Sequence, residues 1–251
     1  MKETRIIMGM PVTVHIVDAS ARAADLEKIF EYFRSVDEQF SAFKRTSELS
    51  RINDGTLAEK DYSPEMKEIM KLSEETRRLT NGYFNIRKPN GAIDTSGLVK
   101  GWAIHHAAKM LKEAGFKNYF VDAGGDIQVA GKNEEGKPWS VGIKDPFDET
   151  QQKIVKVVYL KHGEGIATSG TYIRGQHIYN PHDADNKPIT DIVSITVIGQ
   201  NIYEADRFAT PAFAMGKKGI SFIENIDGLE GYMIDASGIA TFTSGFEKYL
   251  K

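Results

Sequence analysis

The hydrophobic pattern changes near residue 115, and this change limits the folds open to the chain. Before this point, apart from one early strand at residues 12–17, apolar residues recur at helical spacing. In the segment 21–40, one helical face carries Leu26, Ile29, Phe30 and Phe33. Beyond it, apart from one helical segment at 204–215, short apolar runs bounded by glycine and polar residues are typical of strands. Such segregation predicts an α+β fold and not a regular βαβ alternation.

The pattern predicts four long helices and a series of short strands. Ser20 and Ser63 are expected to cap the first two helices, and Pro211 to kink the last. We expect a single integrated domain, residues 1–251, with a largely antiparallel sheet flanked by helices, because no repeat or linker divides the chain. The expected helices are 21–40, 63–80, 98–114 and 204–215; the expected strands are 12–17, 119–121, 127–130, 139–143, 154–160 and 192–198, with a closing hairpin of 232–234 and 240–242.

Composition excludes several classes of protein. A formal net charge of -3 argues against a general nucleic-acid binder. The absence of cysteine rules out thiolate nucleophiles, disulfides and cysteine-ligated metals. No apolar run approaches a membrane span, and the first residues lack a signal-peptide pattern. A cytoplasmic protein is therefore expected, the alternative being an exported protein whose signal has been removed.

Common nucleotide and zinc signatures are absent, which leaves a set of polar, glycine-bearing segments. In the segment 94–103 a polar turn leads into a helix, whose free N–H groups suit an anionic ligand, and Lys100 could add a charge. The alternative is an ordinary helix capped by Asp94 or Ser96. In the segment 121–127, two glycines permit close backbone approach, but a tight turn is the favoured interpretation.

Hydroxyl groups and a histidine follow. Thr168 and Ser169 precede a glycine and could bind a phosphate through hydrogen bonds. His177 could act as a general base near neutral pH. A histidine on a strand with a satisfied hydrogen bond is the commoner alternative.

Asp206 and Thr210 stand four residues apart on the expected helix, so both point from one face. A carboxylate and a hydroxyl are hard oxygen ligands that suit Mg²⁺. Two side chains are too few for a protein cage, but substrate phosphates commonly complete a magnesium shell. The alternative is that Asp206 is solvated and Thr210 bonds back to a helix carbonyl.

Several short motifs occur in a fixed order across most of the chain. They are Met8-Gly9-Met10, then 41–44, 81–84, 96–103, 123–127 and 167–170, then His177-Ile178 with Pro181, and finally 205–206 with 209–210. Together they resemble the ApbE family of FAD:protein FMN transferases. The resemblance implies an enzyme that binds FAD and Mg²⁺ and transfers FMN to a Thr or Ser hydroxyl of an acceptor protein, releasing AMP. Acceptors in the family include flavin-carrying subunits of redox pumps and related reductases.

The resemblance also implies roles for individual residues. Asp206 and Thr210 would bind the metal through their side chains, and Gly97 through its carbonyl. His177 is the candidate base that takes the acceptor's proton. The residues implied to line the FAD site are Met8, Phe43, Tyr83, Phe84, Asp94, Lys100, Thr168, Ser169 and Ile178. Two alternatives are an FAD pyrophosphatase that yields FMN and AMP, and a non-catalytic FAD-binding module.

Three features depart from the family pattern. Asn85 stands where many relatives have Asp, and the stretch between Asn85 and Asp94 is shorter than in those relatives. This difference affects the contacts expected with the adenine half of FAD. Asn180 precedes Pro181 where many relatives have Asp. A lipobox cysteine, present in many exported relatives, is missing, which favours a cytosolic member.

Overall fold

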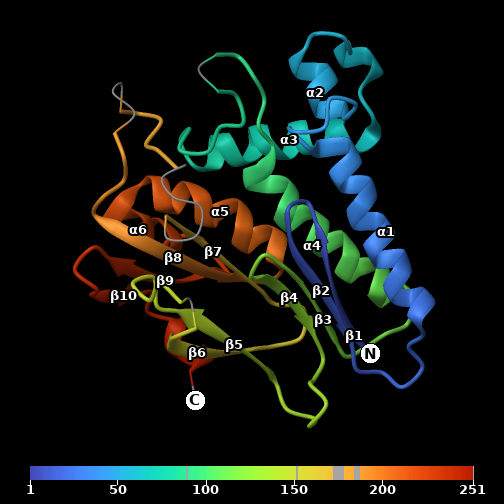
Figure 1. The fold of residues 1–251 in the computed structure, drawn as a ribbon. Coiled ribbons are helices and arrows are strands. Elements are labelled where there is room, and N and C mark those ends of the chain that lie inside the picture. The colour runs from blue at the N-terminus through green and yellow to red at the C-terminus, as the bar shows by residue number, and fades with distance from the viewer. Residues whose placement is uncertain (89, 151, 172–177, 184–186, 251) are drawn as a thin grey trace.

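An eight-stranded antiparallel sheet forms the centre of the computed structural model, which describes residues 1–88, 90–150, 152–171, 178–183 and 187–250 (Figure 1). The strands lie in the order β1-β2-β3-β4-β7-β8-β9-β10. Their bounds are β1 (Lys2–Ile7), β2 (Met10–Ile16), β3 (Tyr119–Ala123), β4 (Asp126–Ala130), β7 (Gly165–Gly170), β8 (Ile192–Gly199), β9 (Glu230–Asp235) and β10 (Ala240–Phe242). The predicted fold class, an α+β domain built on an antiparallel sheet, is confirmed.

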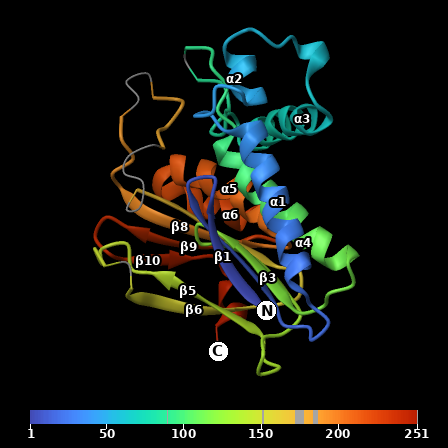
Figure 2. The same ribbon diagram turned by 45° about the vertical axis from the view of Figure 1, so that its right-hand side comes forward.

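The helices gather on one face of this sheet (Figures 1 and 2). They are α1 (Ala23–Phe40), α2 (Glu48–Asn53), α3 (Pro64–Leu79), α4 (Ser96–Glu113), α5 (Ile202–Ala214) and α6 (Gly219–Glu224). The larger apolar core lies between helices and sheet, and the predicted α1 face, Leu26 to Phe33, is buried in it. None of the helices in the described part of the chain is long and apolar enough to cross a membrane.

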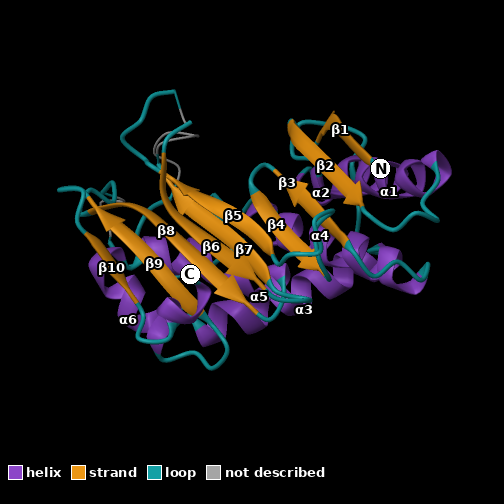
Figure 3. Cartoon of the chain, turned by 90° about the horizontal axis from the view of Figure 1, so that it is seen from below, coloured by secondary structure: helices purple, strands orange, loops and turns teal. Residues whose placement is uncertain are grey.

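A two-stranded sheet covers the opposite face (Figure 3). It consists of β5 (Trp139–Lys144) and β6 (Ile154–Leu160), which pair antiparallel. Trp139, Val158 and Leu160 pack against side chains of the central strands in a second apolar cluster. The eight-stranded sheet is therefore buried on both faces. Its central strands cannot show the alternation of apolar and polar residues that is typical of a half-exposed strand.

Most predicted elements are present, with differences at their ends. Ser63 caps α3 by accepting a hydrogen bond from the N–H of Met66 at 3.0 Å, as predicted. The predicted Ser20 cap is wrong: α1 begins after Arg22, whose N–H donates to Asp25 at 2.9 Å. The helix α5 continues through Pro211 to Ala214.

The two glycines between β3 and β4 form a tight turn. Gly124 and Gly125 have φ angles of +65° and +95°, and Ala123 pairs directly with Asp126. Two consecutive left-handed residues suit a two-residue hairpin and favour glycine. The favoured interpretation of this segment is thus confirmed, and the turn places Asp126 at the start of β4.

Asp122 on β3 gives a pH-dependent stability that can be measured. Burial raises the pKa of this carboxyl to about 6, against the hydrogen bond donated by Gly125 N–H at 2.8 Å. The folded chain therefore holds the proton more tightly than the unfolded chain, whose aspartate pKa is about 3.9. The carboxyl stabilises the fold fully below about pH 4 and loses this contribution as the pH rises through 6.

The substitution Asp122→Asn removes this titration while keeping an acceptor for Gly125. We expect the free energy of unfolding to rise by about 1–2 kcal/mol near pH 7.5, less than the full shift implies because the side chain is only half-buried. Near pH 4 the variant and the wild type should match to within about 0.5 kcal/mol. Urea denaturation at both pH values measures the difference, and an equal effect at both would contradict the assignment.

Candidate functional site

Asp206 lies where α5 crosses α4. Asn201 caps α5 by accepting the N–H of Glu204 at 2.9 Å, and Asp206 follows in the next turn. Its side chain is buried, with 5% exposed, and Oδ2 accepts the N–H of Gly101 on α4 at 2.8 Å. The alternative of a solvated Asp206 is therefore wrong.

A lysine lies between two buried carboxylates. Lys100 Nζ forms a close ion pair with Asp126 and lies 3.5 Å from Asp206 Oδ1. Burial raises the pKa of Asp206 above its usual range, against the Lys100 ammonium and with a further contribution from Asp126. When both carboxylates are ionised, these three side chains carry an excess negative charge in a buried place, which favours a bound cation.

Asp126 was not among the candidate site residues. Its Oδ1 accepts the N–H of Thr168 at 3.1 Å, and its Oδ2 faces Lys100. It therefore joins β7 to α4 beside Asp206. The signal in the sequence was a single aspartate after two glycines, which reads equally well as a turn residue.

Thr210 and Gly97 lie close to each other, as the predicted metal site requires. A methyl group on Gly97 would lie 4.0 Å from Thr210 Cγ2 and 3.2 Å from the ring of Phe84. Thr210 Oγ1 lies 3.3 Å from Ser169 Oγ on β7. The first turn of α4, the third turn of α5 and β7 thus converge at one place.

The donor set fits Mg²⁺. Among the residues that the structure describes, no group of three or more His, Cys, Asp or Glu side chains could hold a metal ion. A cation here would depend on the Asp206 carboxylate, the Thr210 hydroxyl and the Gly97 carbonyl, all hard oxygen donors. The N–H of Gly101, which helical geometry directs toward the carbonyl of Gly97, also donates to Asp206 Oδ2 at 2.8 Å, so Asp206 and this carbonyl face the same turn of α4.

An aromatic segment follows α3 and borders this site. Phe84 is buried, with its N–H donated to Thr80 Oγ1 at 3.0 Å. The ring of Tyr83 contacts the ring of His182 edge-on, with centroids 4.6 Å apart. His182 Nε2 lies 2.9 Å from the carbonyl oxygen of Asn81, which can only accept, so the proton resides on Nε2. Like Asp126, His182 is a residue beside the predicted site that the sequence motifs did not indicate.

Asp94 precedes α4 and is held on both sides. Its Oδ1 accepts the N–H of Ser96 at 3.0 Å and its Oδ2 pairs with Lys88 at 2.8 Å. Burial acts to raise the pKa of Asp94, but these hydrogen bonds outweigh it and hold the pKa below its usual value. Asn53 bonds both backbone groups of Ile93, at 2.7 and 2.9 Å, which fixes the turn. The alternative of a helix capped by Asp94 or Ser96 is wrong, because Thr95 occupies the N-cap of α4 and its side chain makes no capping hydrogen bond there. Asp94 instead bonds the N–H of Ser96 from the residue before the cap.

The structure places three of the remaining predicted site residues, Met8, Ile178 and Phe43, and does not describe His177. Met8 occupies the β1–β2 turn with a φ of +56°, and Ile178 is buried in the larger core. The side chain of Phe43 is 98% exposed, so it extends into solvent. His177 lies outside the described residues. The roles of all the predicted site residues stay predictions.

Comparison with known proteins identifies relatives over most of the chain. The model of the ApbE family matches residues 8–88 and 86–233. A Klebsiella pneumoniae protein named FAD:protein FMN transferase is 33% identical over 167 residues, which cover 62% of this chain and 47% of that protein. A Haemophilus influenzae protein of the same name is 25% identical over 98% of this chain and 92% of its own length.

Solved structures agree in fold. The flavin transferase ApbE from Vibrio cholerae superposes with a TM-score of 0.87 at 23% identity, covering 100% of this chain and 99% of that one. In the alignments to the first of the curated relatives, the chain spans about half of their length.

Proposed function

The chain belongs to the ApbE family, and we propose that it transfers FMN from FAD, with Mg²⁺, to a Thr or Ser hydroxyl of an acceptor protein and releases AMP. The names of relatives such as those from Klebsiella pneumoniae and Haemophilus influenzae support flavin transfer. The metal rests on the oxygen donors of the site, and the Thr or Ser acceptor rests on the resemblance to the family.

The reaction is a phosphoryl transfer at the diphosphate of FAD. The acceptor oxygen forms a bond to the phosphorus of the FMN half, the bond from that phosphorus to the bridging oxygen breaks, and AMP leaves with that oxygen. The hydroxyl proton passes to a base, for which His177 is the candidate. A bound divalent cation would neutralise charge on the diphosphate oxygens.

One observation carries this proposal: the Asp206 carboxylate is buried against α4, one helical turn before Thr210, with Gly97 beside Thr210. Lys100 holds Asp126 and faces Asp206, so the carboxylates keep fixed positions. The ring of Phe84 lies 3.2 Å from where a β-carbon on Gly97 would stand, so it places an aromatic surface next to the oxygen donors. A flavin nucleotide presents an aromatic ring and a diphosphate, which match these two parts.

Mass spectrometry of a co-expressed acceptor tests the transfer. The acceptor domain should be a flavin-carrying subunit with a Thr or Ser at its modification site. We expect a mass increase equal to FMN minus water, confined to one hydroxyl residue, and none when the acceptor residue is changed to Ala. An unmodified acceptor in the presence of FAD and Mg²⁺ would contradict the proposal.

Incubation of the chain with FAD and Mg²⁺, without an acceptor, separates the two alternatives. Rapid release of FMN and AMP would favour a pyrophosphatase, because water would then replace the acceptor hydroxyl. Tight FAD binding without turnover and without a magnesium effect would favour a passive binding module. A transferase should release little AMP until the acceptor is added.

A further inference from the structure

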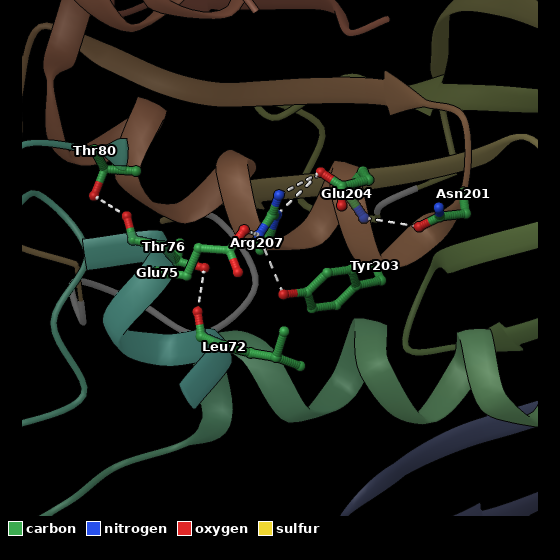
Figure 4. A network of polar contacts seen from close by, with 8 residues as sticks. All are labelled: Leu72, Glu75, Thr76, Thr80, Asn201, Tyr203, Glu204 and Arg207. Atoms are coloured by element: carbon green, nitrogen blue, oxygen red, sulfur yellow. Dashed lines mark hydrogen bonds and ion pairs between the residues drawn. The ribbon is translucent and has the colours of Figure 1, made fainter. Parts of the chain in front are cut away.

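Arg207 follows Asp206 on α5 and is held from several sides (Figure 4). Its side chain is 9% exposed. Nε and Nη2 contact Glu204 Oε2 at 3.0 and 2.8 Å, while Nη1 contacts the hydroxyl of Tyr203 at 3.2 Å. The guanidinium also lies over the rings of Tyr203 and Phe208, at 4.9 and 4.6 Å. A planar cation with so many partners has one orientation.

The remaining contact of Arg207 reaches another helix. Nη1 lies 3.3 Å from Glu75 Oε1 on α3, 132 residues earlier in the chain. Figure 4 shows the Glu75 side chain extending from α3 toward Arg207. The ion pair therefore connects α5, which carries Asp206 and Thr210, with α3.

The end of α3 is connected in turn to the aromatic segment. Thr76 and Thr80 are fully buried, and Thr80 Oγ1 donates to the Thr76 carbonyl at 2.8 Å. The same hydroxyl accepts the N–H of Phe84 at 3.0 Å. The position of α3 therefore sets the position of Phe84.

These contacts form a closed circuit around the site. It runs from α5 through Glu75 to α3, through Thr80 to Phe84, and from Phe84 to Gly97 on α4. It returns to α5 through the bond from Gly101 to Asp206. Because this chain of contacts begins and ends on α5, it fixes the distance between the aromatic segment and the oxygen donors. Loss of the Glu75–Arg207 contact would let α3 shift relative to α5.

We propose that the Arg207–Glu75 ion pair positions the Tyr83–Phe84 segment against the Asp206–Thr210 face of α5, and so sets the affinity for the flavin half of the substrate. This inference rests on the proposed function. Arg207 and Glu75 are positioning residues, since their partners are protein side chains. Their effect on the reaction passes through Phe84.

The substitution Glu75→Ala opens the circuit without leaving a buried charge unpaired, because Arg207 keeps Glu204. We expect KM for FAD to rise about tenfold while kcat stays within about twofold, since ordering the aromatic segment then costs binding energy. Quenching of flavin fluorescence on titration should give the same loss in affinity. Glu75→Gln keeps an oxygen that accepts a hydrogen bond from Arg207, so this variant should retain most of the FAD affinity that Glu75→Ala loses.

Glu74→Ala is the matched control. Glu74 neighbours Glu75 but pairs with Arg77 of its own helix at 2.7 Å, in an exposed position. It should leave KM, kcat and FAD affinity within about twofold of wild type. A thermal melt of each variant separates affinity from folding.

The outcomes distinguish the two proposals. If the wild type transfers FMN but Glu75→Ala behaves like Glu74→Ala, the positioning role is refuted and the proposed function stands. If Glu75→Ala lowers the melting temperature with KM unchanged, the pair is only structural and the inference is again refuted. If the wild type neither binds FAD nor modifies an acceptor, the proposed function fails first.

Discussion

Replacing Asp206 by Asn should reduce metal-dependent FMN transfer by at least about a hundredfold. The carboxylate is the one charged oxygen donor in the proposed set with Thr210 and Gly97, and an amide oxygen binds Mg²⁺ weakly. The rate of FMN incorporation into an acceptor, followed by flavin fluorescence of the modified protein, measures the loss. Raising Mg²⁺ should recover part of the activity, because the defect lies in metal affinity.

The same variant should stay folded. Asp206 is buried with Asp126 nearby, and its charged form is unfavourable there, as the direction of its pKa shift indicates. Asn keeps an acceptor for the N–H of Gly101 and removes the charge. We therefore expect a melting temperature no lower than that of the wild type. Asp227→Asn, a change of the same type at an exposed position, serves as the control. Undiminished transfer by Asp206→Asn would refute the metal assignment.

The spacing of apolar residues predicted those helices and strands in which one repeat, helical or alternating, decides which residues are buried. The α1 face and the short apolar strands each follow a single repeat, and both are present. The strand β1 was missed because KETRII is largely exposed, so its apolar residues show little pattern. The strand β7 was missed because GIATSG is small and polar, although most of it is buried. Pairing on both sides, with β4 and β8, makes that segment a strand.

The site was predictable only where its residues are neighbours in sequence. Helical spacing places Asp206 and Thr210 on one face, but whether that face meets water or another helix depends on tertiary packing. The burial of Asp206 arises from α4, more than a hundred residues earlier. Asp126 joins the site through Lys100 and Thr168, contacts that no local pattern records. The pairing of Arg207 with Glu75 is hidden for the same reason.

Gly101→Ala should destabilise the fold and impair transfer together. A methyl group at this position would lie 2.5 Å from Asp206 Cβ and 2.8 Å from its Oδ2, inside any real contact distance. Glycine to alanine in a helix normally adds about 1 kcal/mol of stability. Here overpacking between α4 and α5 should reverse the sign, with a net loss of about 1–3 kcal/mol. Urea denaturation measures it, and the displaced carboxylate should lower transfer about tenfold or more.

Two double variants identify the atom responsible. Asp206→Ala keeps the β-carbon that makes the shortest contact, so Gly101→Ala should remain costly in that background. Asp206→Gly removes this carbon and leaves room for the new methyl group, so the cost of Gly101→Ala should shrink by more than about 1 kcal/mol. Equal costs in both backgrounds would show that the Asp206 β-carbon is not the source of the clash. A stabilising Gly101→Ala in the wild-type background would also refute the close crossing that buries Asp206, and with it the geometric basis of the proposed metal site.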